Sequence, residues 1–160
     1  MTVPESEAST PLTPPATTGG GDIPWFEAAM QEMALGVDEI PGPEDNPRIV
    51  GYHQTTTLAA EDDETPWCSS FVNWCVQQTG LQGTKSASAR SWLGWGRELP
   101  APQRGCIVVL SRGSHVQQGH VGFYHEDAGE RILVLGGNQG NRVNISSFLK
   151  SRVLSYRWPR

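Results

Sequence analysis

Hydrophobic residues are spaced very differently in the first 22 residues and in the rest of the chain. Residues 1–22 are rich in Pro, Thr, Ser and Gly and contain almost no large apolar side chains, so they cannot bury enough surface to become ordered. We expect a flexible tail or linker there. From Ile23 the sequence IPWFEAAMQEMALGV carries apolar residues at helical spacing and is followed by the break PGPEDNP, which predicts an amphipathic helix and a loop. One globular domain over residues 23–160 is therefore predicted.

Two more helices are predicted from the positions of proline. Proline lacks the amide hydrogen that the first turn of a helix leaves unpaired, so it suits the first helical position. Pro47 after Asn46 predicts a short helix through RIVGYHQ, and Pro66 after Thr65 predicts a helix through WCSSFVNWC. The segment SASARSWLGWG is expected to form a further short helix ended by glycine.

The periodicity changes from helical to extended after residue 105. Four short segments, rich in β-branched and aromatic residues and separated by Gly, Asn, Asp and Ser, predict strands: CIVVL (106–110), HVGFYH (120–125), RILVLG (131–136) and VLSYRW (153–158). Helices come first and an antiparallel sheet follows, which is the order of an α+β fold.

The net charge of −5 hides an asymmetry between the two parts of the chain. Residues 1–64 hold 13 acidic residues and one basic residue (−12), whereas residues 65–160 hold 4 acidic and 11 basic residues (+7). The basic residues are scattered, without the dense cluster and interleaved aromatics of a nucleic-acid surface, so no nucleic-acid partner is expected. The excess of basic residues in 65–160 fits either an anionic substrate or an ordinary solvated surface.

The sequence carries no signal for a membrane, a metal or a cofactor. There is no run of about 18 apolar residues and no basic, apolar start of a secretory signal peptide, so we expect no membrane span and synthesis in the cytoplasm. Three cysteines without a C-x-x-C pair favour neither a disulfide framework nor a zinc ribbon. With the spaced histidines they give no zinc spacing.

Cys68 and Cys75 occupy different positions on the predicted helix. Cys68 falls in the first turn, where unpaired amides and the helix dipole favour a thiolate, and it is therefore suited to be a nucleophile. The alternative for Cys68 is a small buried hydrophobic residue. Cys75 lies two turns on, along the face of Phe71 and Val72, where burial makes a thiol inert, and it is expected to pack in the core.

A thiol nucleophile needs a base, and the base needs a group that orients its ring. Of the four histidines, His53 and His115 are expected at the surface, and His125 is expected to face the opposite side of a strand from His120. His120 has Gly122 on its own side of the pleat, which leaves the ring uncrowded, and it is predicted to be the base.

Asn138 is the predicted orienting group. It lies in GGNQGN, after two glycines that let the backbone come close, and next to His120 if the two strands pair through the turn EDAGE. Its amide oxygen would accept the imidazole hydrogen. Gln139 is a substitute for this role, and the alternative for the whole segment is a simple Gly/Asn-rich turn.

Several ordered motifs together resemble a known family. The runs DDETPWCSSFVNWCVQQTG, ARSWLGWG, GHVGFY, VLGGNQGNRVNI and YRWP are similar to the CHAP and NlpC-type cysteine peptidases, in particular to a short subfamily of phage lysis modules and bacterial toxins, over about residues 46–160. The resemblance implies a papain-like α+β domain, hydrolysis of amide bonds in peptidoglycan stem peptides or cross-bridges, and a triad of Cys68, His120 and Asn138.

Two positions depart from the family pattern. Trp67 stands where many NlpC-type members have aspartate, and Cys106 stands where related sequences have the aspartate of a Gly-Asp pair. Cys106 is expected to be either an isolated packing thiol or the disulfide partner of Cys75. Asp63 and Trp67 are candidates for lining the substrate cleft, with Asp63 either binding a substrate amine or belonging to an exposed acidic turn.

The function expected from these features is that of a peptidoglycan hydrolase, either an interbacterial effector or a phage-type lysin. Such a protein would act at the cell wall or periplasm after delivery by a secretion machine or after lysis, and an effector would need an immunity protein in the producing cell. Two alternatives stay open: a thiol acyltransferase of the same fold, and a non-catalytic wall-binding or interaction module in which Cys68 is structural.

Overall fold

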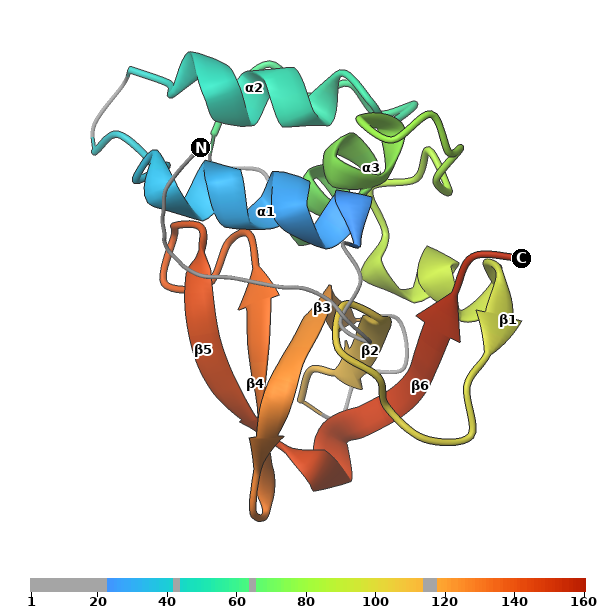
Figure 1. Ribbon diagram of the computed structural model, residues 1–160. Helices are drawn as coiled ribbons and strands as arrows, with labels where there is room; N and C mark the ends of the chain where they lie inside the picture. The colour runs from blue at the N-terminus through green and yellow to red at the C-terminus, as the bar shows by residue number, and fades with distance from the viewer. Residues whose placement is uncertain (1–22, 42–43, 64–65, 114–117) are drawn as a thin grey trace, which may run out of the picture.

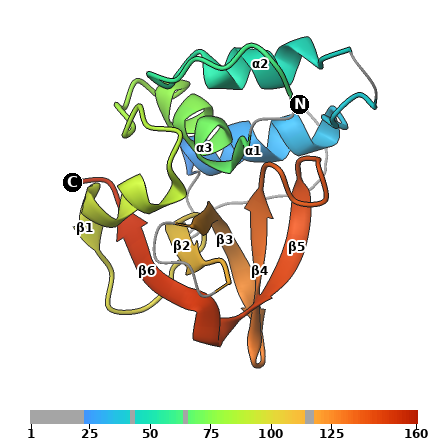
Figure 2. The same cartoon turned by 180° about the vertical axis from the view of Figure 1, so that it is seen from behind.

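The computed structural model of the protein describes residues 23–41, 44–63, 66–113 and 118–160. The tail expected at residues 1–22, the expected cap Thr65 and the histidine His115 lie outside the described residues. Helices gather on one side of a single curved sheet, and the strands bend away from them (Figures 1 and 2). The predicted α+β fold, with N-terminal helices packed on an antiparallel sheet, is confirmed.

The α-helices begin close to the predicted positions. They are α1 (Pro24–Ala34), α2 (Pro47–His53) and α3 (Cys68–Gln77). In α2, Asn46 caps the helix, because its side chain accepts a hydrogen bond of 2.8 Å from the amide of Arg48. Helix α3 begins at Cys68, two residues after the predicted start at Pro66. The segment SASARSWLGWG forms the 3-10 helix η1 (Ala89–Gly94).

The six strands form an antiparallel sheet in the order β1-β6-β2-β3-β4-β5. Strands were predicted at β2 (Ile107–Ser111), β3 (Gly119–Ala128), β4 (Arg131–Gly136) and β6 (Val153–Trp158), and the structure confirms them. The sequence pattern missed β1 (Arg97–Glu98), which is two residues long, and β5 (Asn144–Leu149), whose polar residues are half exposed. The 3-10 helix η2 (Lys150–Arg152) joins β5 to β6.

Each face of the sheet has its own hydrophobic cluster. On the helical side, Phe123 of β3 packs edge-on against Phe26 of α1 and Phe71 of α3, with ring centroids 6.4 Å apart in both pairs. The other face buries Leu110, Ile132 and Val134 among other residues. The curved sheet thus buries side chains on both faces, and α3 is fixed against β3.

A buried carboxylate fastens α1 to α2. Glu32 is 2% exposed, and its side chain accepts hydrogen bonds from Nη2 of Arg48 (2.6 Å) and from the hydroxyl of Tyr52 (2.6 Å). A buried charge is tolerated only when it is paired and hydrogen-bonded. The ring of Tyr52 in turn packs against Trp67 and Phe71, with centroids 5.9 and 5.2 Å away. This chain of contacts holds the residues around the start of α3.

The segment after β4 approaches the start of α3 so closely that only glycine fits. A Cβ atom at Gly137 would lie 2.7 Å from a ring carbon of Trp67 and 2.8 Å from Cβ of Phe71. Both neighbours are fully buried and have no room to move. Gly137 therefore brings the next residues, Asn138 and Gln139, up against α3.

Gly137→Ala should destabilise the protein by about 1–3 kcal/mol, because the added methyl group overpacks a rigid contact. Gly51→Ala is the matched control: it makes the same change inside α2, where a Cβ would meet nothing within 4 Å, and it should stabilise by about 0.5–1 kcal/mol. Urea unfolding of both variants measures the two effects. Equal effects of the same sign would contradict the close packing at Gly137.

Candidate active site

The thiol of Cys68 lies at the first residue of α3 and is almost fully covered. Its exposed fraction is 5%. Hydrogen bonding from the backbone of Ser69 in α3 and of Val121 in β3 helps to lower the pKa of this thiol. A sulfur that accepts amide hydrogen bonds at a helix start is held in the environment that favours a thiolate.

His120 of β3 faces this sulfur. The strand pairing sets His120 opposite Leu110 of β2, next to the start of α3, and its side chain is 6% exposed. A hydrogen bond and the charge of His120 lower the pKa of the Cys68 thiol, and the same interactions with Cys68 raise the pKa of the imidazole. The predicted base therefore lies against the predicted nucleophile.

Gln139, and not Asn138, supplies the amide that contacts the ring. The distance from Nε2 of His120 to Oε1 of Gln139 is 2.9 Å. The Gln139 amide nitrogen donates to the carbonyl oxygens of Val134 (3.1 Å) and Asn144 (2.8 Å), so the amide oxygen is the atom turned toward the ring. Nε2 therefore carries hydrogen and donates it, which leaves Nδ1 to face the thiol.

The position of Asn138 corrects the contact expected from the sequence. Its backbone φ is +58°, in the left-handed region that asparagine tolerates better than most residues. In the described part of the chain the Asn138 side chain makes no hydrogen bond to His120, whose amide partner is Gln139. The turn after Gly137 thus points the second amide of the Asn-Gln pair, not the first, at the ring.

The pair Cys68 and His120 shifts the pKa of both groups toward an ion pair. Burial on its own raises the pKa of the Cys68 thiol, but the hydrogen bond and charge of His120, with the two backbone amides, outweigh burial and lower that pKa below 9.0. Burial lowers the pKa of His120, but the hydrogen bond and charge of Cys68 and the contact with Gln139 raise it above 6.5. Each group is the counterion that lets the other be charged.

The other two cysteines are free thiols in the core. Cys75 and Cys106 are fully buried and belong to hydrophobic clusters on opposite faces of the sheet. Burial raises the pKa of Cys75 well above the ordinary value and the pKa of Cys106 to about 11. The structure therefore places both as packing residues with protonated thiols, and Cys106 is not the disulfide partner of Cys75.

Two histidines outside the pair lie in protein contacts. His53 was expected at the surface, but it is 0% exposed, and its Nδ1 lies 2.8 Å from the hydroxyl of Ser70. His125 stacks on Phe26 with centroids 6.1 Å apart, and burial followed by the charge of Arg104 lowers its pKa.

Asp63 and Trp67 are buried, which corrects the positions expected for both. Asp63 is 0% exposed, and its Oδ2 accepts hydrogen bonds from the amides of Ile40 and Asn46, 2.9 Å each. It therefore holds a loop and does not belong to an exposed turn. Trp67 is also 0% exposed, and its indole nitrogen donates to Glu39 at 2.8 Å. The structure places neither side chain where it could line an open cleft.

Sequence reasoning missed Phe148 as a neighbour of the catalytic candidates. Its ring stacks on the imidazole of His120, with centroids 5.2 Å apart and planes 27° apart. Phe148 belongs to β5, which the sequence pattern did not predict. The signal that could have found it is the period-two spacing of Asn144, Ser146 and Phe148, which puts all three on one face of the strand.

The described residues contain no group of three or more His, Cys, Asp or Glu side chains that could hold a metal ion. In the same part of the chain, no helix has the length and apolar character that crossing a membrane requires.

Native protein treated with iodoacetamide should be modified at Cys68 first. The rate should rise with a midpoint below that of a free thiol such as N-acetylcysteine amide, because the pKa of Cys68 is lowered. Cys75 and Cys106 should react only after unfolding. His120→Gln should move the midpoint for Cys68 upward. Mass spectrometry of tryptic peptides measures all three sites, and equal slow rates at all three would contradict the ion pair.

Residues 60–138 match the family model of the CHAP domain, a stretch that includes Cys68 and His120. No curated protein matches the chain. A solved structure from Staphylococcus aureus, a protein similar to lipoprotein of the NLP/P60 family, shares 13% identity with a TM-score of 0.45; the match covers 86% of this chain and 41% of that one.

The chain thus spans less than half of that protein. Over residues 60–138 the protein is similar to the CHAP domain family, which confirms the resemblance predicted from its sequence.

Proposed function

We propose that the protein is a cysteine hydrolase that cleaves amide bonds in the peptides of peptidoglycan. The observation that carries this proposal is the buried, hydrogen-bonded series Cys68, His120 and Gln139. In the proposal, Cys68 is the nucleophile, His120 is the acid and base, and Gln139 orients the imidazole. This arrangement satisfies the three roles that thiol-dependent acyl transfer needs.

The reaction begins with the Cys68 thiolate, which attacks the scissile carbonyl carbon. The oxygen of the tetrahedral intermediate becomes negative at the start of α3, where the first amides of the helix have no partner within the helix. His120, protonated before attack, gives its proton to the leaving amine as the carbon–nitrogen bond breaks. The products of this step are an amine and a thioester on Cys68.

Water then completes hydrolysis. His120, now neutral, takes a proton from water as the hydroxide attacks the thioester, and the thiolate leaves with the imidazolium restored beside it. Gln139 keeps Nε2 protonated through both steps, so Nδ1 is always the nitrogen that exchanges the proton. An acyltransferase would differ only in the second step, where an amine would replace water.

Peptidoglycan as the substrate rests on the similarity to the CHAP domain. Action at the cell wall or periplasm follows from that substrate, after delivery by a secretion machine or after lysis. We keep the effector and lysin roles as part of this proposal, and an immunity protein would be the partner of the effector form.

Purified peptidoglycan should release new fragments when incubated with the wild-type protein and none with Cys68→Ala. Mass spectrometry of the fragments identifies the cleaved bond, and an added amine such as glycine methyl ester reports acyl transfer as a mass adduct. Cys75→Ala is the matched control, because it removes a thiol that the proposal does not use. Fragments that persist in Cys68→Ala would overturn the assignment of the nucleophile.

Gln139→Ala should lower kcat/KM about 10- to 100-fold, because the imidazole loses the partner that fixes its tautomer. Asn138→Gly should have little effect, since glycine accepts the positive φ at that position and the side chain does not bond to the ring. The pH profile separates orientation from folding: Gln139→Ala should lower the pKa of His120 as well as the rate. A larger loss of kcat/KM in Asn138→Gly than in Gln139→Ala would show that Asn138, and not Gln139, orients the imidazole.

A further inference from the structure

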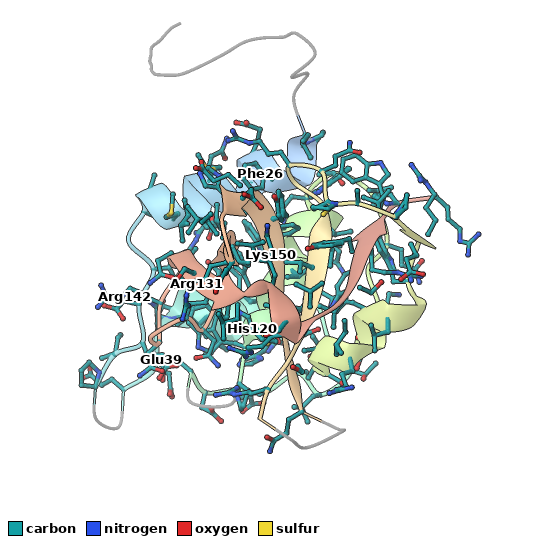
Figure 3. The ribbon with its side chains drawn as sticks, turned by 90° about the horizontal axis from the view of Figure 1, so that it is seen from below. Phe26, Glu39, His120, Arg131, Arg142 and Lys150 are labelled. Carbon is teal, nitrogen blue, oxygen red and sulfur yellow. The ribbon has the colours of Figure 1, made fainter. Side chains whose placement is uncertain are left out.

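The imidazole of His120 is the first of three stacked groups. Phe148 of β5 covers it with ring centroids 5.2 Å apart, and the guanidinium of Arg152 lies 5.3 Å from the centroid of the Phe148 ring. In the view of Figure 3, His120 lies next to the segment of β5 and η2 that carries Phe148 and Arg152. Phe148 and Arg152 are both half-buried, so they have exposed surface beside a catalytic candidate that has almost none.

Arg152 is fixed in place by the strand next to His120. Its Nε and Nη2 donate to the carbonyl oxygen of Ser111 at 3.0 and 2.7 Å. Ser111 ends β2 and pairs with Gly119, the residue before His120. The guanidinium is therefore held at a set position, and its remaining nitrogen, Nη1, makes no hydrogen bond within the described part of the chain.

A second arginine, Arg112, follows the residue that holds Arg152. Arg112 directly follows Ser111 and is exposed, and its charge acts on His120, where it opposes protonation. The acidic residues of β3, Glu126 and Asp127, lie at the opposite end of that strand, and Asp127 is paired with Lys150. The guanidinium of Arg152 thus lies at Ser111, next to Arg112 in the chain and at the end of β3 that carries His120.

The chemistry of the proposed reaction decides which part of a substrate meets this surface. The proton for the leaving amine comes from His120, so the leaving part of the substrate must lie on the side of the imidazole. The acyl part stays with Cys68 and the amides of α3. A surface that extends from His120 through Phe148 to Arg152 therefore lies along the leaving group.

We infer that Arg152 and Arg112, with Phe148 beneath the substrate, form a subsite for a carboxylate on the leaving group. The preferred substrate is a peptide in which the residue after the cleaved bond carries a free carboxylate. Arginine suits this task because its planar guanidinium binds carboxylates in a fixed geometry and stacks on aromatic rings. This inference rests on the proposed hydrolase function and names a substrate class for it.

The test uses stem tetrapeptide, L-Ala-γ-D-Glu-meso-diaminopimelate-D-Ala, with its carboxylates free or converted one at a time to carboxamides. Wild type should cleave the peptide with free carboxylates about 10- to 100-fold faster, in kcat/KM, than the peptide whose carboxylate on the leaving group is a carboxamide. Arg152→Gln should bring this ratio close to one, and Arg112→Gln should reduce it. Arg131→Gln is the matched control, since Arg131 is an exposed arginine that also bonds to a strand, at Ser147, and has no part in the proposed subsite.

A wild-type ratio near one, or a ratio that Arg152→Gln and Arg112→Gln both leave unchanged, would overturn the subsite. Arg112 is exposed, so its variant should fold even if Arg152→Gln does not. Binding of the same peptides to Cys68→Ala, measured by calorimetry, tests the carboxylate subsite separately from the hydrolase function. If wild type cleaves none of the peptides but binding prefers the free carboxylate, and the arginine variants lose that preference, the subsite is supported and the hydrolase function is overturned. If there is neither cleavage nor a preference in binding, both proposals are overturned.

Discussion

A thiol and an imidazole buried side by side can both be charged only if each is the counterion of the other. Burial alone opposes both charges, since it raises the pKa of Cys68 and lowers that of His120. Their hydrogen bond and mutual attraction reverse both shifts. Because an unpaired charge at this depth would be strongly disfavoured, the lowered pKa of Cys68 depends on the position of a residue more than fifty positions away in the sequence.

The fold supplies that position through close packing. The ring of Phe123 on β3 packs against Phe71 on α3, which fixes the strand that carries His120 against the helix that carries Cys68. Gly137 lets the backbone after β4 rest on Trp67 and Phe71, and the turn then directs Gln139 at the imidazole. The buried residues Trp67 and Asp63 serve this framework: one packs beneath Gly137, and the other ties loop amides ahead of α2.

Much of this arrangement could be predicted from local signals. The helix at Pro47, the four main strands, the place of Cys68 at a helix start and the nearness of His120 to Cys68 all follow from spacing and residue type within a few positions. The amide that contacts the ring did not follow, because Asn138 and Gln139 are adjacent amides and the turn at Asn138, with the bonds of Gln139 to Val134 and Asn144, sets which of them faces the ring. The burial of His53, Asp63 and Trp67 depends on distant segments, and β5 lacks the hydrophobic alternation that marks a strand.

The charge state of His120 tests the central claim most directly. The ring nitrogens of 15N-labelled protein report protonation by NMR as the pH is varied. The account predicts that His120 titrates with a midpoint above 6.5 in the wild type, and that the midpoint falls below 6.5 in Cys68→Ala, where burial acts without the thiolate. A wild-type midpoint below 6.5 that does not change in Cys68→Ala would show that the two residues do not form an ion pair.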